Sequence, residues 1–332
     1  MWIHFALFAT LLLPAALLGL RGRAGRRGSP VLLGVAFVAF VTFSSLRAVS
    51  VGNDTVEYHR VFKAIAATDS FQEALSVSRF EYGYVLVNYL VSRLTQDFNI
   101  LLLITSVFVY GSAVLFIKRY AASYSLAVLF AFGMSVFYDL MLAVRQGIAV
   151  AIFLLAVPAL MERKLVRYVL LVVLASQFHV SVLLLLVVYL IPYMRLSTFG
   201  DWFKWGALIG IVMFSLSWLL SLLLISSAYY GHYLHSDYAD GGVRSATVLL
   251  IITRIILLLL AATCGWNASV EADPSGRTRN LLALAVTDVA LVVIALGFNL
   301  LDRIEMYLTL PFAVGLANLA AHGERPERSY VS

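Results

Sequence analysis

The sequence predicts an all-α polytopic integral membrane protein, with about 9–11 membrane helices including one or two short or re-entrant ones. Hydrophobic residues make up 62% of the 332 residues and charged residues only 13%, whereas soluble domains carry about 25% charged residues. Apolar runs of the length that crosses a bilayer, about 17–25 residues, recur along the whole chain. We therefore expect a single integral membrane domain over residues 1–332.

The charge and cysteine content exclude several other classes of protein. The net charge is +6, but the basic residues lie singly and in small groups between apolar runs, which is typical of orientation signals and not of a nucleic-acid surface. The single cysteine, Cys264, lies inside an apolar run, where inert packing is its usual role. The sequence has no spacing typical of metal ligands, so we expect no metal and no other cofactor.

The first apolar segment, Met1–Leu20, is followed by several arginines in residues 21–27. A cleaved signal peptide carries its positive charge before the apolar core, so this segment is expected to be a spanning helix. The arginines place its start on the outer side of the membrane and residues 21–27 in the cytoplasm. The next segment, Pro30–Leu46, then returns the chain to the outer side.

Residues 47–84 form the longest polar passage, which we expect to be an outer loop. Its two ends carry Gly52-Asn53-Asp54-Thr55 and Arg79-Phe80-Glu81-Tyr82-Gly83-Tyr84. The apolar spacing between these ends predicts one or two short amphipathic helices; the residues that carry it are Val61, Phe62, Ile65, Ala66 and Phe71. A second, smaller outer loop is expected at residues 227–245.

Further apolar segments are Tyr84–Leu94, Ile100–Ile117, Tyr124–Tyr138, Met141–Met161, Leu165–Ile191, Trp205–Ser226, Ala246–Gly265, Leu281–Gly297 and Leu300–Ala321. Residues 84–94 are too few to span comfortably, and residues 165–191 are many for one span. Two models remain: both segments span, or the first stays on the outer side and the second re-enters and turns at His179. We prefer the second model because it places more basic residues in the cytoplasm.

Arg145 lies in the sequence Tyr138-Asp139-Leu140-Met141-Leu142-Ala143-Val144-Arg145-Gln146-Gly147. Aspartate is a favourable N-cap, so we expect a helix that begins near Asp139 and carries Arg145 in its first two turns. The positive end of the helix dipole adds to the guanidinium charge there, which favours a diphosphate. The alternative is an ion pair with Asp139 or a side chain that extends to the membrane interface.

His179 interrupts an apolar run in the sequence Ser176-Gln177-Phe178-His179. Irregular backbone at membrane depth persists only where it lines a polar cavity or packs within protein. An imidazole there can accept a proton from a hydroxyl group or donate a hydrogen bond to a phosphate. The alternative is a hydrogen-bonded core residue without a chemical role.

The last apolar segment begins with a charged sequence, Asp302-Arg303-Ile304-Glu305-Met306-Tyr307. Arg303 and Tyr307 are four residues apart and share one face of a helix. Two arginines at two helix starts, Arg145 and Arg303, suit the two phosphates of a lipid diphosphate. The alternative is that the neighbouring carboxylates neutralise Arg303.

Arg254 and Asp288 lie near the middles of consecutive antiparallel apolar segments. Their matching depth predicts a buried ion pair that holds the two helices together, with a proton relay as the alternative.

Five short motifs in this order resemble the EpsG-like family, the Wzy-type polymerases of bacterial exopolysaccharide and O-antigen. They are Gly52-x-Asp54-Thr55-x-x-Tyr58, Phe80-Glu81-x-Gly83-Tyr84, Arg145-Gln146-x-x-Ala149, Phe178-His179-x-Ser181 and Arg303-x-x-x-Tyr307. One departure is Tyr82, which stands where the family pattern has proline and leaves the turn beside Glu81 less rigid.

The resemblance implies a multi-helix membrane glycosyltransferase fold of the GT-C-like type and an enzyme that needs no metal. The growing glycan is expected to pass from undecaprenyl diphosphate to the terminal sugar of a lipid-linked repeat unit. The reaction is expected at the periplasmic face of the bacterial inner membrane, in exopolysaccharide or lipopolysaccharide biosynthesis. The implied partners are the lipid-linked oligosaccharide, membrane lipid and a chain-length regulator, with no nucleic acid.

The motifs then suggest a role for each candidate residue. The base candidates are His179, Asp54 and Glu81; the candidate diphosphate ligands are Arg145 and Arg303; the candidate sugar-pocket residues are Tyr58, Tyr84 and Tyr307. Two other functions stay open: a transporter or flippase of lipid-linked oligosaccharide, with Arg254 and Asp288 as a coupling pair, and a membrane sugar O-acyltransferase. Polar residues gather on one side of the expected topology, which favours the polymerase.

Overall fold

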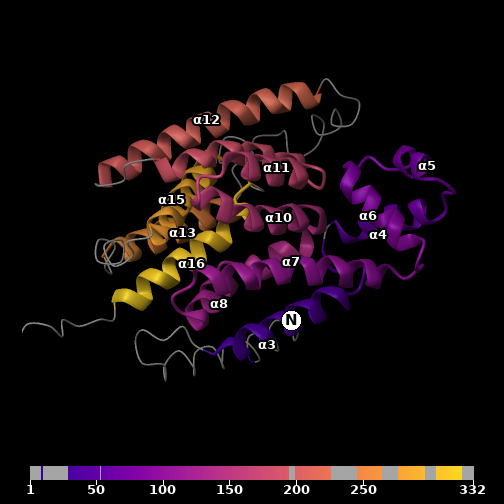
Figure 1. Cartoon of the computed structure of the whole chain (residues 1–332), viewed down its shortest axis with the longest axis horizontal. Coiled ribbons are helices and arrows are strands. Elements are labelled where there is room, and N and C mark those ends of the chain that lie inside the picture. Colours follow the sequence, from indigo (N-terminus) through magenta and orange to yellow (C-terminus); the bar gives the residue numbers. More distant parts are fainter. Residues whose placement is uncertain are drawn as a thin grey trace, which may run out of the picture. The chain divides into compact units, whose positions relative to one another are not determined.

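The computed structural model describes residues 9, 29–52, 54–193, 199–225, 245–263, 276–295 and 304–323, and every regular element within them is helical (Figure 1). The chain divides into two compact units. Unit 1 comprises Met1–Leu32, Ile117–Met134 and Leu184–Ser332, and unit 2 comprises Leu33–Phe116 and Ser135–Leu183. Most of the first predicted span, and all but the last residue of the predicted second loop at 227–245, lie outside the described residues.

Unit 2 contains six of the eight predicted site residues. Its helices are most of α3 (Pro30–Ser45), α4 (Thr55–Ala66), α5 (Phe71–Ser76), α6 (Tyr82–Ser92), most of α7 (Phe98–Tyr120), α9 (Val136–Leu142), α10 (Val144–Met161) and α11 (Leu165–Ser176). Within this unit, α4, α5 and α6 group together near one end of the longer helices α7 and α10 (Figure 1).

The polar passage at 47–84 folds into two short helices, α4 and α5, as its apolar spacing predicts. Val61 and Ile65 on α4 pack in one buried cluster with Ala74 of α5 and Val85 of α6. Ser70 caps α5 by accepting a hydrogen bond from the backbone N–H of Glu73. The passage is therefore a packed part of unit 2 with its own small core.

Helix α6 is short, as the apolar length of residues 84–94 suggested. It has 11 residues, which at 1.5 Å per residue gives about 16 Å, roughly half of the ~30 Å hydrocarbon layer. Helix α6 packs against α4 and α5, so it belongs structurally to the polar passage that precedes it.

The prediction that a helix starts near Asp139 is wrong. The apolar run from residue 124 is broken at Ser135, whose φ of 62° is left-handed, and Asp139 lies inside the short helix α9. A second break at Ala143 precedes α10, whose second residue is Arg145. Gly147 permits this tight joint, because a Cβ atom there would lie 2.9 Å from the carbonyl oxygen of Leu140.

The long apolar run at 165–191 is interrupted where the sequence indicated. Helix α11 ends at Ser176, and a 3₁₀ helix, η2, follows from Val180 to Tyr193. Runs of 3₁₀ helix longer than about 3–4 residues are uncommon, and η2 has 14 residues. His179 lies between the end of α11 and the start of η2, so it stands on irregular backbone. The re-entrant path of this segment stays a prediction.

Unit 1 contains α8 (Tyr124–Gly133), α12 (Phe199–Ile225), α13 (Ser245–Thr263), α15 (Arg277–Ala295) and α16 (Met306–Gly323). Helix α16 packs against α8 and α15. The buried side chain of Asn318 on α16 donates to the carbonyl of Tyr120 at 3.0 Å and accepts from the N–H of Ala122 at 2.7 Å. This amide satisfies backbone groups at the end of α7 and fastens that end to α16.

The predicted ion pair between Arg254 and Asp288 is confirmed, on α13 and α15. Both side chains are buried, at 2% and 0% exposure. Glu305, just before α16, also pairs with Arg254, and Thr309 on α16 accepts a hydrogen bond from the same guanidinium at 3.1 Å. Three helices of unit 1 are thus joined through one arginine.

The described helices are those of a membrane protein. Two of them, α7 and α10, are long and apolar enough to cross a bilayer, and the broken pair α8 and α9 makes a third if it counts as one span. Several other apolar helices in the described residues are shorter, among them α3 and α11. The all-helical architecture is as predicted, and the total of about 9–11 membrane helices stays a prediction.

Arg254→Met should destabilise unit 1 strongly, because it leaves Asp288 and Glu305 as buried carboxylates without their cation. The expected loss is about 3–5 kcal/mol, measured by SDS unfolding of the purified protein in mixed micelles. Lys204→Met on α12 is the matched control, since Lys204 is exposed and its loss should cost at most about 1 kcal/mol. Equal unfolding midpoints for the two variants would contradict a structural role for Arg254.

Candidate functional site

Three aromatic rings from the second half of the polar passage and from α4 pack together. The ring of Tyr58 on α4 lies 5.7 Å from Phe80 and 5.7 Å from Tyr84, and Phe80 lies 5.5 Å from Tyr84, all in edge-to-face arrangements. Tyr58 and Tyr84 are buried, at 2% and 0% exposure. This aromatic cluster of Tyr58, Phe80 and Tyr84 unites the first two motifs.

Arg145 lies against this cluster. Its guanidinium carbon is 4.1 Å from the centre of the Phe80 ring, within the range of a cation–π contact. Its Nη1 forms an ion pair with Oε2 of Glu81, the residue just before α6. Both side chains are only 13% exposed. The carboxylate that holds Arg145 is therefore Glu81, and the alternative that named Asp139 is wrong.

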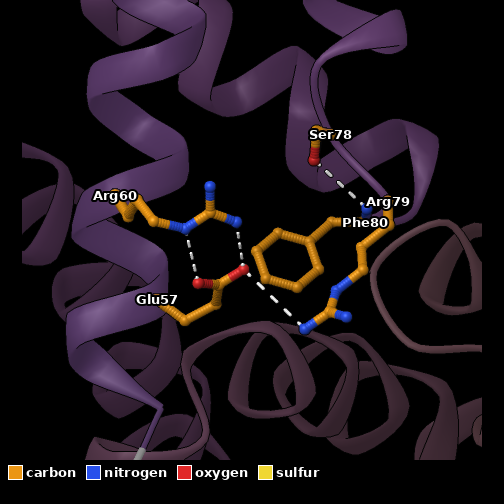
Figure 2. Close-up of polar contacts among 5 residues, drawn as sticks. All are labelled: Glu57, Arg60, Ser78, Arg79 and Phe80. Carbon is orange, nitrogen blue, oxygen red and sulfur yellow. Dashed lines mark hydrogen bonds and ion pairs between the residues drawn. The ribbon is translucent and has the colours of Figure 1, made fainter. Parts of the chain in front are cut away.

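The loop that carries Phe80 is fastened to α4 by Glu57, as Figure 2 shows. Arg60 donates two hydrogen bonds to the Glu57 carboxylate, at 2.8 Å and 2.7 Å. Arg79 approaches the same carboxylate at 3.8 Å from the other side, and the N–H of Phe80 donates to Ser78 Oγ at 3.1 Å. The sequence analysis assigned no role to Glu57, although this residue directly precedes Tyr58 of the first motif.

A backbone contact joins the second motif to the His179 motif. The N–H of Gly83 donates to the carbonyl of Gln177 at 2.8 Å. A Cβ atom at residue 83 would lie 2.8 Å from that same oxygen, so only glycine permits this approach. Glu81 precedes Gly83 by two residues, and His179 follows Gln177 by two. The contact between the start of α6 and the end of α11 therefore lies two residues from each of two candidate residues, Glu81 and His179.

His179 is half-buried, and its Nδ1 lies 2.8 Å from Ser181 Oγ. Asp54 is also half-buried and directly precedes α4, four residues before Tyr58. Gly52 has a φ of +95°, and a Cβ atom there would lie 2.6 Å from a methyl carbon of Leu142. The Gly52 turn, which precedes Asp54 and α4, therefore packs against Leu142 at the end of α9.

Of the two named residues of the fifth motif, only Tyr307 has a described position. Arg303 lies outside the described residues, so its role at the diphosphate stays a prediction. Tyr307 is fully buried at the start of α16 in unit 1, whereas the other candidates lie in unit 2. Among the residues with described positions, no group of three or more His, Cys, Asp or Glu side chains could hold a metal ion.

Electrostatics link Tyr84 to two arginines. Burial raises the pKa of the Tyr84 phenol, which the nearby charges of Arg145 and Arg47 oppose. The phenol is therefore neutral and available as a hydrogen-bond donor near neutral pH. Arg47 follows the end of α3, and sequence reasoning named it only as the first residue of the polar passage.

Gly83→Ala should separate α6 from α11. The added methyl group collides with Gln177, so we expect a loss of about 1–3 kcal/mol in unfolding free energy, measured by thermal melting in detergent. Gly34→Ala on α3 is the matched control, because a Cβ atom at Gly34 meets no atom within 4 Å. A Gly83→Ala protein as stable as the control would show that this junction is not tight.

Glu57→Gln should change how stability depends on pH. The hydrogen bonds from Arg60 lower the pKa of Glu57, so the carboxylate stabilises the fold above its unfolded pKa of about 4.3. That contribution is lost as the pH falls through the lower folded pKa. Melting temperatures across the acid range should therefore fall less steeply in Glu57→Gln than in the unsubstituted protein. Parallel curves would argue against the pairing.

Comparison with known proteins gives one significant result. The model of the EpsG family matches residues 31–329, which include all five motifs and nearly the whole chain. No curated protein and no solved structure matches the chain significantly, so the GT-C-like architecture stays a prediction. A match of this extent, together with motif residues that meet in unit 2, decides the assignment: the chain belongs to the EpsG family.

Proposed function

We propose that this protein is a metal-independent Wzy-type polysaccharide polymerase, in which the glycan on undecaprenyl diphosphate is transferred to the terminal sugar of a lipid-linked repeat unit. Membership of the EpsG family supports an exopolysaccharide-related polymerase. The proposed site faces the periplasm at the inner membrane. The proposed assembly includes a chain-length regulator.

The observation that carries this proposal is the seat of Arg145. Glu81 takes one end of the guanidinium and Phe80 covers its face, so the group is held in one orientation. A guanidinium has five N–H donors, and the ion pair with Glu81 involves only Nη1. Arg145 is also the second residue of α10, where the positive end of the helix dipole reinforces its charge. This arrangement suits a diphosphate.

The reaction requires charge stabilisation where the leaving group departs. The oxygen of the acceptor hydroxyl attacks the anomeric carbon, the bond from that carbon to the diphosphate oxygen breaks, and undecaprenyl diphosphate leaves. Negative charge grows on the diphosphate as this bond breaks, and Arg145 stabilises it. Glu81 in this scheme positions Arg145, and Arg303 remains the second proposed ligand.

The proton of the acceptor hydroxyl goes to His179. When Nδ1 donates to Ser181 Oγ, the lone pair of the imidazole lies on Nε2, which is then the accepting atom. The second candidate for the base is Asp54, which precedes the α4 helix that carries Tyr58. Tyr58 and Tyr84 are both buried, so in this scheme they shape the site through packing. Tyr307 stays a proposed sugar-pocket residue.

Two alternatives would use other features. A flippase or transporter of lipid-linked oligosaccharide would use the buried cluster of Arg254, Asp288 and Glu305 as a coupling element. An O-acyltransferase would use His179 with an acyl donor. Only a polymerase makes longer glycans from lipid-linked repeat units unaided, so the product separates the three functions.

Arg145→Lys should abolish most elongation, because a point charge cannot keep both the Glu81 contact and a forked contact with phosphate. In proteoliposomes with lipid-linked repeat units, we expect Arg145→Lys to lower the elongation rate about 10²–10³-fold. We expect His179→Ala to lower the same rate about 10²–10⁴-fold. Glycan length on gels is the readout. Arg93→Lys is the control, since Arg93 is an exposed residue at the end of α6.

Normal glycan ladders from stably folded Arg145→Lys and His179→Ala proteins would remove both residues from the mechanism. If His179→Ala alone is normal, Asp54→Asn tests the second base. If the unsubstituted protein leaves the lipid-linked repeat units at their starting length, the proposal that it is a polymerase is contradicted.

A further inference from the structure

Arg47 is a buried arginine at the end of α3. Only 7% of the surface of this residue is exposed. Its Nη1 donates to the carbonyl oxygen of Ser44 at 2.6 Å and to Ser44 Oγ at 3.1 Å. Ser44 Oγ in turn accepts from Ser106 Oγ on α7 at 2.8 Å. One edge of the Arg47 guanidinium is therefore anchored to a packed junction of two helices.

The other edge of this guanidinium is buried and has no acceptor among the residues that the structure describes. Within the described ranges, Nε and Nη2 of Arg47 are both buried and have no hydrogen-bond partner. The ionisable side chains that lie near Arg47 are those of Tyr110, Tyr84 and Tyr58, and no described carboxylate is among them. A buried cation costs much free energy unless an anion compensates it. This seat therefore calls for an anion.

Other buried arginines in the described part of the chain differ in this respect. Arg254 is paired with Asp288 and Glu305, and Arg145 with Glu81. A simple helix cap does not explain Arg47 either. Arg93 caps the end of α4 by donating to the carbonyls of Ile65 and Ala66, yet it stays exposed. Capping accounts for Nη1 of Arg47 but not for the burial of Nε and Nη2.

Arg47 and Arg145 act on the same part of unit 2. The Tyr84 phenol is influenced by the charges of both arginines. Tyr58 and Tyr84 thus lie near both guanidinium groups. One arginine comes from the end of α3 and the other from the start of α10, so residues almost 100 positions apart in the sequence converge on one pair of tyrosines.

We propose that Arg47 is a second ligand of the lipid diphosphate and holds one phosphate while Arg145 holds the other. This inference rests on the proposed function, which supplies a lipid diphosphate as substrate. A diphosphate offers two groups of acceptor oxygens, and each guanidinium fork suits one of them. The seat of Arg47 provides two N–H groups, on Nε and Nη2, for such a contact.

The test measures binding of undecaprenyl diphosphate and of undecaprenyl monophosphate to the full-length protein in nanodiscs. Arg47→Met should weaken diphosphate binding about 10- to 100-fold, since it removes charge-assisted hydrogen bonds. Monophosphate binding should fall only about 2- to 3-fold, because Arg145 suffices for one phosphate. The ratio of the two affinities is the readout, because a merely structural role would not change it.

Arg93→Met is the matched control, since Arg93 also caps a helix but is exposed. Its ratio should equal that of the unsubstituted protein. Arg47→Lys keeps the charge and tests the proposal if Arg47→Met does not fold. Its diphosphate affinity should fall about 3- to 10-fold, because lysine lacks the fork. Thermal melting confirms that each variant is folded.

An unchanged ratio in a folded Arg47→Met or Arg47→Lys protein would overturn the proposal and leave Arg47 as a helix cap. Addition of inorganic pyrophosphate should compete with the lipid diphosphate in the unsubstituted protein and less in Arg47→Met. Failure of the proposed function has a different signature, because the unsubstituted protein would then not elongate glycans in proteoliposomes. The binding ratio still tests Arg47 in that case.

Discussion

The ion pair between Arg145 and Glu81 is the interaction on which the candidate site depends. It joins the start of α10 to the residue before α6, and Phe80 covers it on one side. Exposed ion pairs contribute little because water competes and salt screens them. This pair is mostly buried, at 13% exposure for each side chain. Removal of either partner would therefore leave the other charge buried, with little water to solvate it.

The surroundings of this pair are arranged to keep it in place. Glu57 fixes the loop that carries Phe80 to α4, and the Gly83 N–H ties α6 to the carbonyl of Gln177. The residues that give the site its orientation are therefore not the residues that would touch substrate. A polar passage that reads as a loop can hold a rigid site because α4, α5 and α6 share a small core.

Arg254 in unit 1 solves a similar problem differently. Its charge is met by two carboxylates, Asp288 and Glu305, and by the Thr309 hydroxyl. The charge of Arg254 is thus compensated within the protein, and the cluster holds three helices together. Arg47 in unit 2 has only Ser44 as a described hydrogen-bond partner. Arg254 is paired with carboxylates, whereas Arg47 has no carboxylate partner among the described residues, and this contrast separates a structural ion cluster from a candidate ligand site.

The amino-acid sequence by itself determined the helical membrane class, the short amphipathic helices at 47–84, the short α6, the break at His179 and the pairing of Arg254 with Asp288. These follow from local patterns: apolar length, 3.6-residue spacing and matching depth of opposite charges. The motifs also indicated the EpsG family. What local patterns could not supply is which carboxylate meets which arginine.

Tertiary structure alone decided those partners. Asp139 was the near neighbour of Arg145 in the sequence, but the left-handed turn at Ser135 and the break at Ala143 put Asp139 inside α9 and Arg145 at the start of α10. Glu81, 64 positions away, then became its partner. Arg47 looked like an ordinary residue at a helix end until its burial and its tyrosine neighbours were known. The physical reason is that burial and long-range pairing arise from packing, whereas sequence patterns report only neighbours along the chain.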